Sequence, residues 1–125
     1  MSVVHRFTGT ESNFLWENVK IQNYESGLEG VTKQVPIGPN EDSNNFYIRY
    51  FRLEPGKKSN KESHSHEHGV IIMHGHAKVQ VNQDFFELHP KDAVFISSND
   101  LHQFTALVKS RWAFYVLSSP TKLLN

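Results

Sequence analysis

Short runs of β-branched and aromatic residues alternate with clusters of turn-forming residues over most of the chain after residue 45. Runs of this length, each bounded by Gly, Pro, Asn, Asp or Ser, are typical of β-strands joined by tight connections. Residues 77–81 alternate apolar and polar side chains, the period-two pattern of a half-buried strand. The strands expected are 46–53, 70–73, 77–81, 85–88, 93–96, 102–107 and 112–117. Because no long helical pattern follows Gly30, the sequence predicts an all-β, antiparallel barrel or sandwich.

The chain length of 125 residues fits one domain. Nine Phe, four Tyr and two Trp supply bulky side chains for one packed core. We expect a single domain over 1–125, with its core at about 46–117 and the N-terminal segment 1–30 packing on the barrel or on a dimer partner. Residues 36–45 are dense in turn formers and are expected to form an exposed loop.

Charge and composition narrow the classes of partner. The 13 basic and 13 acidic residues cancel and the pI is near 7.1. With no basic stripe, electrostatics do not favour a nucleic-acid partner. The N-terminus lacks the apolar core of a signal peptide and no apolar run is long enough to span a membrane, so we expect a cytoplasmic protein without a membrane partner.

Histidine is the residue type that points to chemistry. Five of the eight His lie at positions 64, 66, 68, 74 and 76. Because the chain has no Cys, any metal site must use imidazole, carboxylate and water. A His-rich loop is also typical of a solvated surface or an adventitious metal binder. Since four residues of extended strand span roughly 13 Å, His64 and His68 can share one ion only if the chain turns at 65–67.

Two spaced motifs carry a family resemblance. The first runs Gly56-x5-Glu62-x-His64-x3-His68-x6-Gly75, and the second runs from Pro90-Lys91-Asp92 to His102-Gln103-Phe104. The first resembles the first motif of the cupin superfamily without a gap, and the second is similar to that superfamily's second motif. The span from about 31 to 120 is similar to the small single-domain metal cupins, including the small manganese cupins. The resemblance implies an RmlC-like jelly roll, also called a double-stranded β-helix.

The resemblance also implies a metal site. The ungapped alignment gives one divalent transition metal (Mn, Fe, Ni, Co or Zn) with Glu62, His64, His68 and His102 as ligands. The pair His64-Ser65-His66 looks like the family's usual His-x-His, so His66 is the alternative ligand. That choice needs an insertion in the preceding loop, which is structurally cheap. Glu62 stands where the family usually has His.

Two further residues are candidates for a substrate pocket. Phe104 shares a strand face with His102, so it can wall a pocket, although a core role is the simpler interpretation. Arg49 fits an outer-face ion pair or, alternatively, the binding of an anionic substrate. No residue stands out as a catalytic acid, base or nucleophile.

Two classes of function stay open. The first is an enzyme acting on a small organic molecule, with an oxygenase as one of the activities that the resemblance implies. The second is a non-catalytic binding or sensing module for a small molecule, with or without metal. It is favoured by departures from the family pattern at Glu62, Lys91 and Ser97, and by the absence of an obvious second catalytic group. A metal-free, epimerase-like cupin is a third interpretation. Small cupins commonly pair, so we expect a homodimer, with apolar area supplied by residues 16–21.

Overall fold

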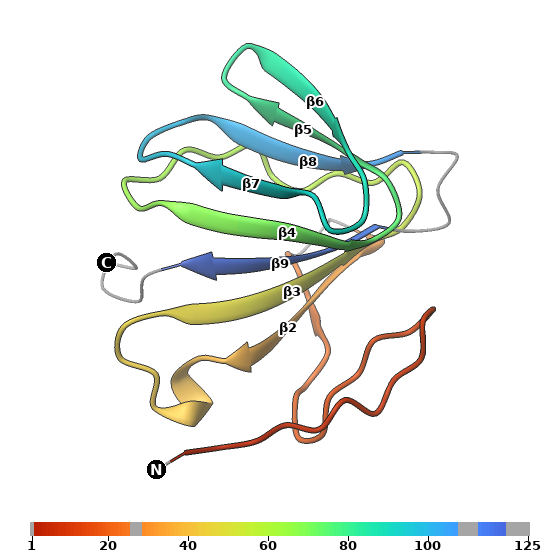
Figure 1. The fold of residues 1–125 in the computed structure, drawn as a ribbon, viewed down its shortest axis with the longest axis vertical. Helices are drawn as coiled ribbons and strands as arrows, with labels where there is room; N and C mark the ends of the chain where they lie inside the picture. The colour runs from red at the N-terminus through yellow and green to blue at the C-terminus, as the bar shows by residue number, and fades with distance from the viewer. Residues whose placement is uncertain (1, 26–28, 108–112, 120–125) are drawn as a thin grey trace.

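Two antiparallel β-sheets pack face to face in the computed structural model, which describes residues 2–25 and 29–107, and the backbone of 113–119 (Figure 1). The strands are β1 (Gln22–Asn23), β2 (Val31–Ile37), β3 (Tyr47–Leu53), β4 (His68–His74), β5 (Ala77–Val81), β6 (Asp84–Leu88), β7 (Ala93–Ile96), β8 (His102–Ala106) and β9 (Ala113–Ser119). A single 3-10 turn, η1 (Pro39–Glu41), is the only helical element among the described residues. The all-β prediction is confirmed.

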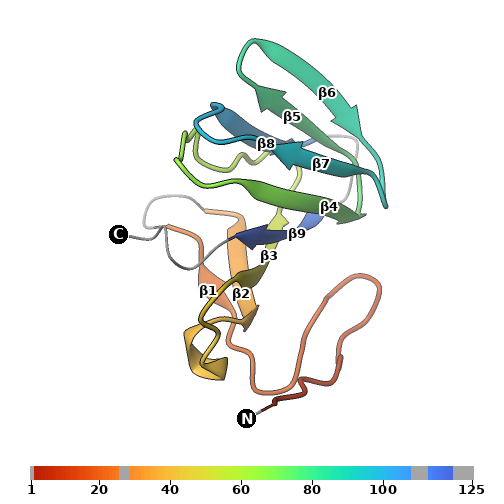
Figure 2. The same cartoon turned by 60° about the vertical axis from the view of Figure 1, so that its left-hand side comes forward.

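The larger sheet has the strand order β1-β2-β3-β9-β4-β7, and the smaller has β6-β5-β8. Every pair of neighbouring strands is antiparallel. The connection after β3 runs alongside β8, with bridges from Lys58 to Thr105 and from Glu62 to His102. It therefore continues the smaller sheet by one irregular strand. Figures 1 and 2 show the smaller sheet over the β4–β7 side of the larger one.

The core lies between the two sheets and follows from the period-two pattern of the strands. Val79 of β5, Phe104 of β8 and Ile72 of β4 are all at most 2% exposed. Alternate residues of the same strands face outward, as Lys78 and Met73 do. Strands β5 and β7 begin and end at the residues predicted, because their alternation and flanking turns are unambiguous.

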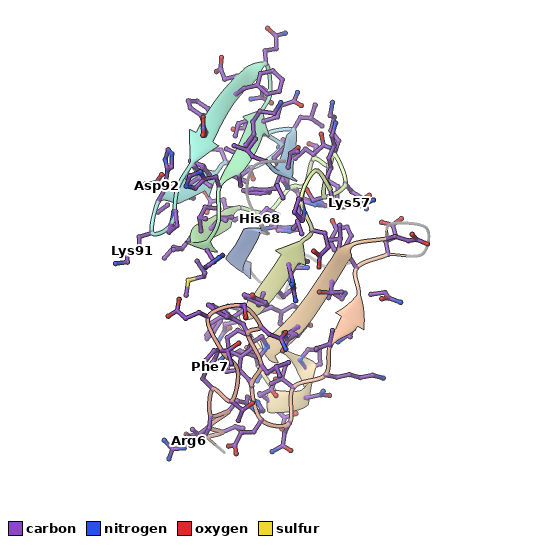
Figure 3. The ribbon with its side chains drawn as sticks, turned by 90° about the vertical axis from the view of Figure 1, so that its right-hand side faces the viewer. Arg6, Phe7, Lys57, His68, Lys91 and Asp92 are labelled. Atoms are coloured by element: carbon purple, nitrogen blue, oxygen red, sulfur yellow. The ribbon has the colours of Figure 1, made fainter. Side chains whose placement is uncertain are left out.

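The N-terminal segment packs on the outer face of the larger sheet. Phe14 stacks on Tyr50 at 5.4 Å between ring centroids, and Trp16 meets the same ring edge-on at 5.1 Å. Tyr50 is 1% exposed as a result. Figure 3 shows Arg6 and Phe7 of this segment far from His68, which lies between the sheets.

The structure adds a strand that the sequence did not predict. Residues 31–37 form β2, so the loop expected at 36–45 begins only after Ile37. Pro36 obscures the pattern, because proline is a poor strand residue, and the pairing with β3 shifts register between Gln34 and Ile37. At the other end, the strand expected at 112–117 appears as β9 (Ala113–Ser119), and Trp112 lies outside the described residues.

Candidate metal centre

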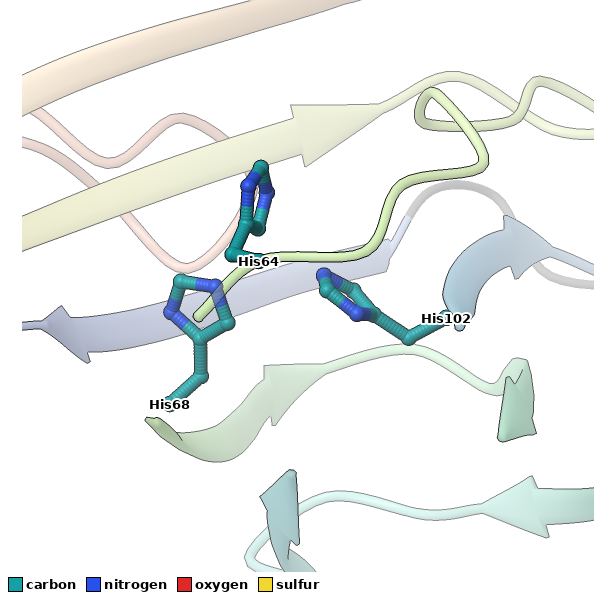
Figure 4. A group of neighbouring side chains, drawn as sticks. All are labelled: His64, His68 and His102. Carbon is teal, nitrogen blue, oxygen red and sulfur yellow. The ribbon is translucent and has the colours of Figure 1, made fainter. Parts of the chain in front are cut away.

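Three imidazole rings from separate segments converge between the sheets. His64 comes from the connection before β4, His68 is the first residue of β4 and His102 is the first of β8. Figure 4 shows the three rings facing one another. One ring nitrogen of each lies within 4.8 Å of the other two. The motif spacing predicted that these three residues share a site, and in the fold their rings lie together.

A bend between His64 and His68 makes the convergence geometrically possible. The backbone bends at Ser65 and His66, so the turn expected at 65–67 is confirmed. The turn before β8 holds this bend in place: the amide of Asn99 donates to the carbonyl of His64. The hydroxyl of Ser63 donates to the carbonyl of Asn99 at 2.8 Å, and Ser98 donates to the carbonyl of Ser65. The segments of the two motifs are thus tied directly to each other.

Backbone pairing fixes the position of His102 and a hydrogen bond fixes its tautomer. Glu62 and His102 exchange backbone hydrogen bonds of 3.0 and 2.8 Å. The ring Nδ1–H of His102 donates to the carbonyl of Asp100 at 3.0 Å. Because Nδ1 carries the proton, Nε2 presents its lone pair, which is the form a metal ligand requires.

The carboxylate of Glu62 lies at the edge of the three-histidine group. Its Oε2 accepts the Nε2–H of His64 at 2.6 Å. The Tyr24 hydroxyl donates to the other oxygen, Oε1, at 3.4 Å. Burial and the nearby Glu62 charge raise the pKa of Tyr24 to about 12, so its hydroxyl stays a donor. Sequence reasoning missed Tyr24, since it lies 38 residues before Glu62 and outside both motifs.

His66 is a buried neighbour of the group. It is 7% exposed and its ring stacks on that of His64, with centroids 4.8 Å apart and planes 13° apart. Its centroid lies 4.6 Å from that of His68. Neither a nitrogen of His66 nor a carboxylate oxygen of Glu62 belongs to the set of atoms that lie mutually within 4.8 Å.

Burial keeps two of these rings neutral. It lowers the pKa of His68 to about 3, with further lowering by the positive charges of His66 and His102. Burial also lowers the pKa of His66, and the positive charge of His64 lowers it further, more than any other charge does. The Nδ1 atoms of His66 and His68 are buried without a hydrogen-bond partner in the described part of the chain. A neutral imidazole with an unsatisfied nitrogen is suited to binding a cation.

The spacing of the three nitrogens is compatible with one shared ion after ring rotation. An ion about 2.0–2.1 Å from each imidazole nitrogen keeps its ligand nitrogens no more than about 4.2 Å apart. The three nitrogens lie within 4.8 Å of one another, so ring rotations that bring them closer would let one ion contact all three. Imidazole with carboxylate is a donor set that suits Mn, Fe, Co, Ni and Zn.

The two pocket candidates lie in different environments. Phe104 is 2% exposed and belongs to the hydrophobic core cluster between the sheets. Arg49 lies two residues before Phe51, on the inner face of β3, and its guanidinium is 5.6 Å from the Phe51 ring. It also lines a pocket at that end of the larger sheet. Arg49 therefore lies on the inner face of β3, not on the outer face considered for it.

A second group of possible ligands lies on the surface. His76, Glu87 and His89 each offer one atom, all within 4.8 Å, and all three residues are exposed. Their position follows from the pairing of Ala77 with Leu88, which sets His76 opposite His89 on the outer face of the smaller sheet.

Across the ranges that the structure describes, no helix has the length and apolar character needed to cross a membrane. The cytoplasmic location stays a prediction.

Comparison with known proteins agrees with this architecture. One curated relative, the 1-methylthio-D-xylulose 5-phosphate methylsulfurylase of Rhodospirillum rubrum, is 34% identical over 104 residues. The match covers 80% of this chain and 65% of the relative's own length. A crystal structure of a cupin-2 domain from Rhodospirillum rubrum superposes with a TM-score of 0.81 at 29% identity, covering 95% of this chain and 80% of that one.

A second crystal structure leads to the same family. The cupin 2 conserved barrel domain protein of Rhodopseudomonas palustris has a TM-score of 0.79 and 25% identity, over 95% of this chain and 81% of that one. The sequence profile of the cupin domain matches residues 49–118, which include both spaced motifs. The chain belongs to the cupin family.

Proposed function

We propose that this cupin binds one divalent transition-metal ion and acts on a small organic molecule at that ion. The observation that carries the proposal is the convergence of ring nitrogens from His64, His68 and His102 within 4.8 Å. The neutral state of buried His68 supports it, because metal binding then requires no proton release from this ring. When bound, the ion supplies Lewis acidity that polarises an oxygen of the substrate.

Glu62 is the fourth ligand in this proposal. The 2.6 Å hydrogen bond from His64 Nε2–H to Glu62 Oε2 holds the carboxylate beside the histidine group, and the shared proton would have to leave for both atoms to act as ligands. Tyr24 keeps the carboxylate turned toward the site through Oε1. His66 packs on His64 and excludes water from one side of the group.

The curated relative supplies the first reaction to test. Its name gives 1-methylthio-D-xylulose 5-phosphate as the substrate and methylsulfurylase as the activity. We propose a reaction on a phosphorylated, sulfur-containing sugar of this kind. An oxygenase acting on a small molecule is the second candidate, favoured by a mixed imidazole and carboxylate donor set like that of non-haem iron centres. Release of a thiol from the sugar phosphate supports the first, and substrate-dependent oxygen uptake supports the second.

A non-catalytic binding module is the alternative from another class. Lys91 and Ser97 depart from the family pattern, and the described residues around the three histidines include no evident nucleophile. Metal-loaded protein that binds the sugar phosphate but neither cleaves it nor consumes oxygen would favour this alternative.

Metal analysis of untagged protein tests the metal proposal. We expect about one ion per chain in the wild type and loss of that ion in His102→Ala. The matched control is His89→Ala, which removes one imidazole from the exposed group instead of the buried one. Equal loss of metal in the two variants, or none in either, would refute the buried site.

We propose that the protein is a homodimer. Ile71 and Met73 of β4 and Phe95 of β7 are 44–62% exposed, and all lie on the outer face of the larger sheet. Pairing this face with a second copy would remove apolar area from water. Sedimentation of a 14.4 kDa species at micromolar concentration would contradict the proposal.

A further inference from the structure

A pocket of about 460 Å³ opens at the end of the larger sheet. Its floor is the inner face of β2 and β3, including Lys33, Val35 and Arg49. Its walls are the segment 18–22, which carries Lys20, and the turn η1. The volume lies in the range of small-molecule sites, about 300–1,000 Å³. We call this site the cationic pocket.

The charge of the cationic pocket is positive. Lys20, Lys33 and Arg49 line it, and Glu41 is the one acidic residue among the described lining residues. Neither Lys20 nor Lys33 has an ion pair within the described ranges of the chain.

The negative charge of Glu41 is already engaged. Its Oε2 lies 2.8 Å from Nε2 of His5, and its Oε1 accepts the backbone N–H of Gly38 at 2.8 Å. The hydrogen bond to Glu41, with a second to the carbonyl of Glu17, raises the pKa of His5. A protonated His5 offsets the Glu41 charge, so Lys20 and Lys33 are left to attract an anion.

The cationic pocket adjoins the histidine group through Arg49. Arg49 pairs with Leu117 of β9, which pairs with Val70 of β4, two residues beyond His68. Two strand spacings amount to about 10 Å. The starts of β3 and β4 lie at the same, left-hand end of the sheet in Figure 1.

We infer that the cationic pocket binds the phosphate group of a phosphorylated substrate whose other end reaches the His64, His68 and His102 group. The inference rests on the proposed function and adds the place where the phosphate binds and the residues that select it. Ammonium and guanidinium groups form charge-assisted hydrogen bonds to phosphate oxygens, and Arg does so through two parallel donors. The positive charge left after the Glu41–His5 contact suits a dianion better than a neutral sugar.

The chain offers a control with matched charge. A smaller pocket of about 210 Å³ on the outer face of the smaller sheet is lined by Lys58, Lys61 and Lys78. It therefore has lysines in similar number but no access to the histidine group. The double variant Lys58→Ala/Lys78→Ala changes the net charge as much as Lys20→Ala/Lys33→Ala does.

The test is a titration followed by NMR, with zinc-loaded full-length protein and two probes, D-ribose 5-phosphate and D-ribose. We expect the phosphate ester to bind at least about tenfold more tightly than the free sugar, the scale of one hydrogen bond to a charged group. Lys20→Ala/Lys33→Ala should remove most of that preference, whereas Lys58→Ala/Lys78→Ala should keep it. If Lys20→Ala/Lys33→Ala unfolds, Lys20→Met/Lys33→Met is used in its place, because Met keeps most of the side-chain stem without the charge.

Several results would overturn the inference. These are equal affinity for the two probes, equal losses of affinity in the two lysine variants, and chemical-shift changes centred on Lys78 rather than Lys33.

The variant His102→Ala separates this inference from the proposed function. It should lose the metal and retain the preference for the phosphate ester, since His102 does not line the pocket. Metal binding without phosphate preference defeats the inference alone, and phosphate preference without metal binding defeats the proposed function alone.

Discussion

Acid should destabilise the metal-free protein through His68. Its pKa is about 3 in the folded chain, against an ordinary value of 6.5, and burial is the largest cause. A histidine whose pKa is depressed by folding contributes its stability above pH 6.5 and loses it as the pH falls toward 3, because only the unfolded chain then binds the proton.

The size of the effect follows from the two pKa values. Between pH 6.5 and 3 each pH unit costs about 1.4 kcal/mol for one proton. From pH 7.5 to pH 4.5 the free energy of unfolding should therefore fall by about 2–3 kcal/mol through His68. The lowered pKa of His66 acts in the same direction.

The assay is urea unfolding of metal-free protein at both pH values, for the wild type and for His68→Gln, which does not titrate. The wild type should lose about 2–3 kcal/mol more than the variant over this range. If His68→Gln is too unstable to measure, NMR titration of the His68 ring in the wild type replaces it. Equal pH dependence in the two proteins, or a His68 ring that titrates near 6.5, would refute the reasoning.

Three further predictions concern the Tyr24 hydrogen bond, the Phe104 side chain and the removal of the metal ion. Tyr24→Phe removes the hydrogen bond to Glu62 Oε1 and should weaken metal binding by about 10–100-fold in a metal titration, with no effect if the contact is incidental. Phe104→Ala should lower the free energy of unfolding by about 3–5 kcal/mol in urea, because the side chain is buried in the core; a loss under about 1 kcal/mol would place it instead in an open pocket. A chelator should lower the stability of the metal-loaded wild type by about 2.7 kcal/mol when the ion had been at 100 times its dissociation constant, and should not affect His102→Ala.

The fold was predictable because strand and turn signals are local. Residues 77–81 and 93–96 show alternation or an apolar run between clear turns, and both ranges hold in the structure. Strand β2 was missed because Pro36 and the polar side chains around it hide a strand that is stabilised by pairing with β3. That pairing is a tertiary contact, which local sequence does not reveal.

The site was predictable in part for a similar reason. Motif spacing identified His64, His68 and His102, since the bend at 65–66 and the turn at 97–100 are encoded nearby in the chain. The Tyr24 hydroxyl reaches Glu62, and the exposed Lys20 lines the cationic pocket. Both residues belong to the N-terminal segment, and no spacing rule connects them to the motifs. The inner-face position of Arg49 depends on strand register, which a one-residue shift would reverse.

The central claim is a ligand set of Glu62, His64, His68 and His102, with His66 beside it. The most direct test is the dissociation constant of a divalent ion, measured for Glu62→Ala and His66→Ala under identical conditions. We predict that Glu62→Ala weakens binding more than about 100-fold, beyond the range of an outer-shell contact, while His66→Ala changes it by about tenfold or less. Loss of binding in His66→Ala together with unchanged binding in Glu62→Ala would contradict the account.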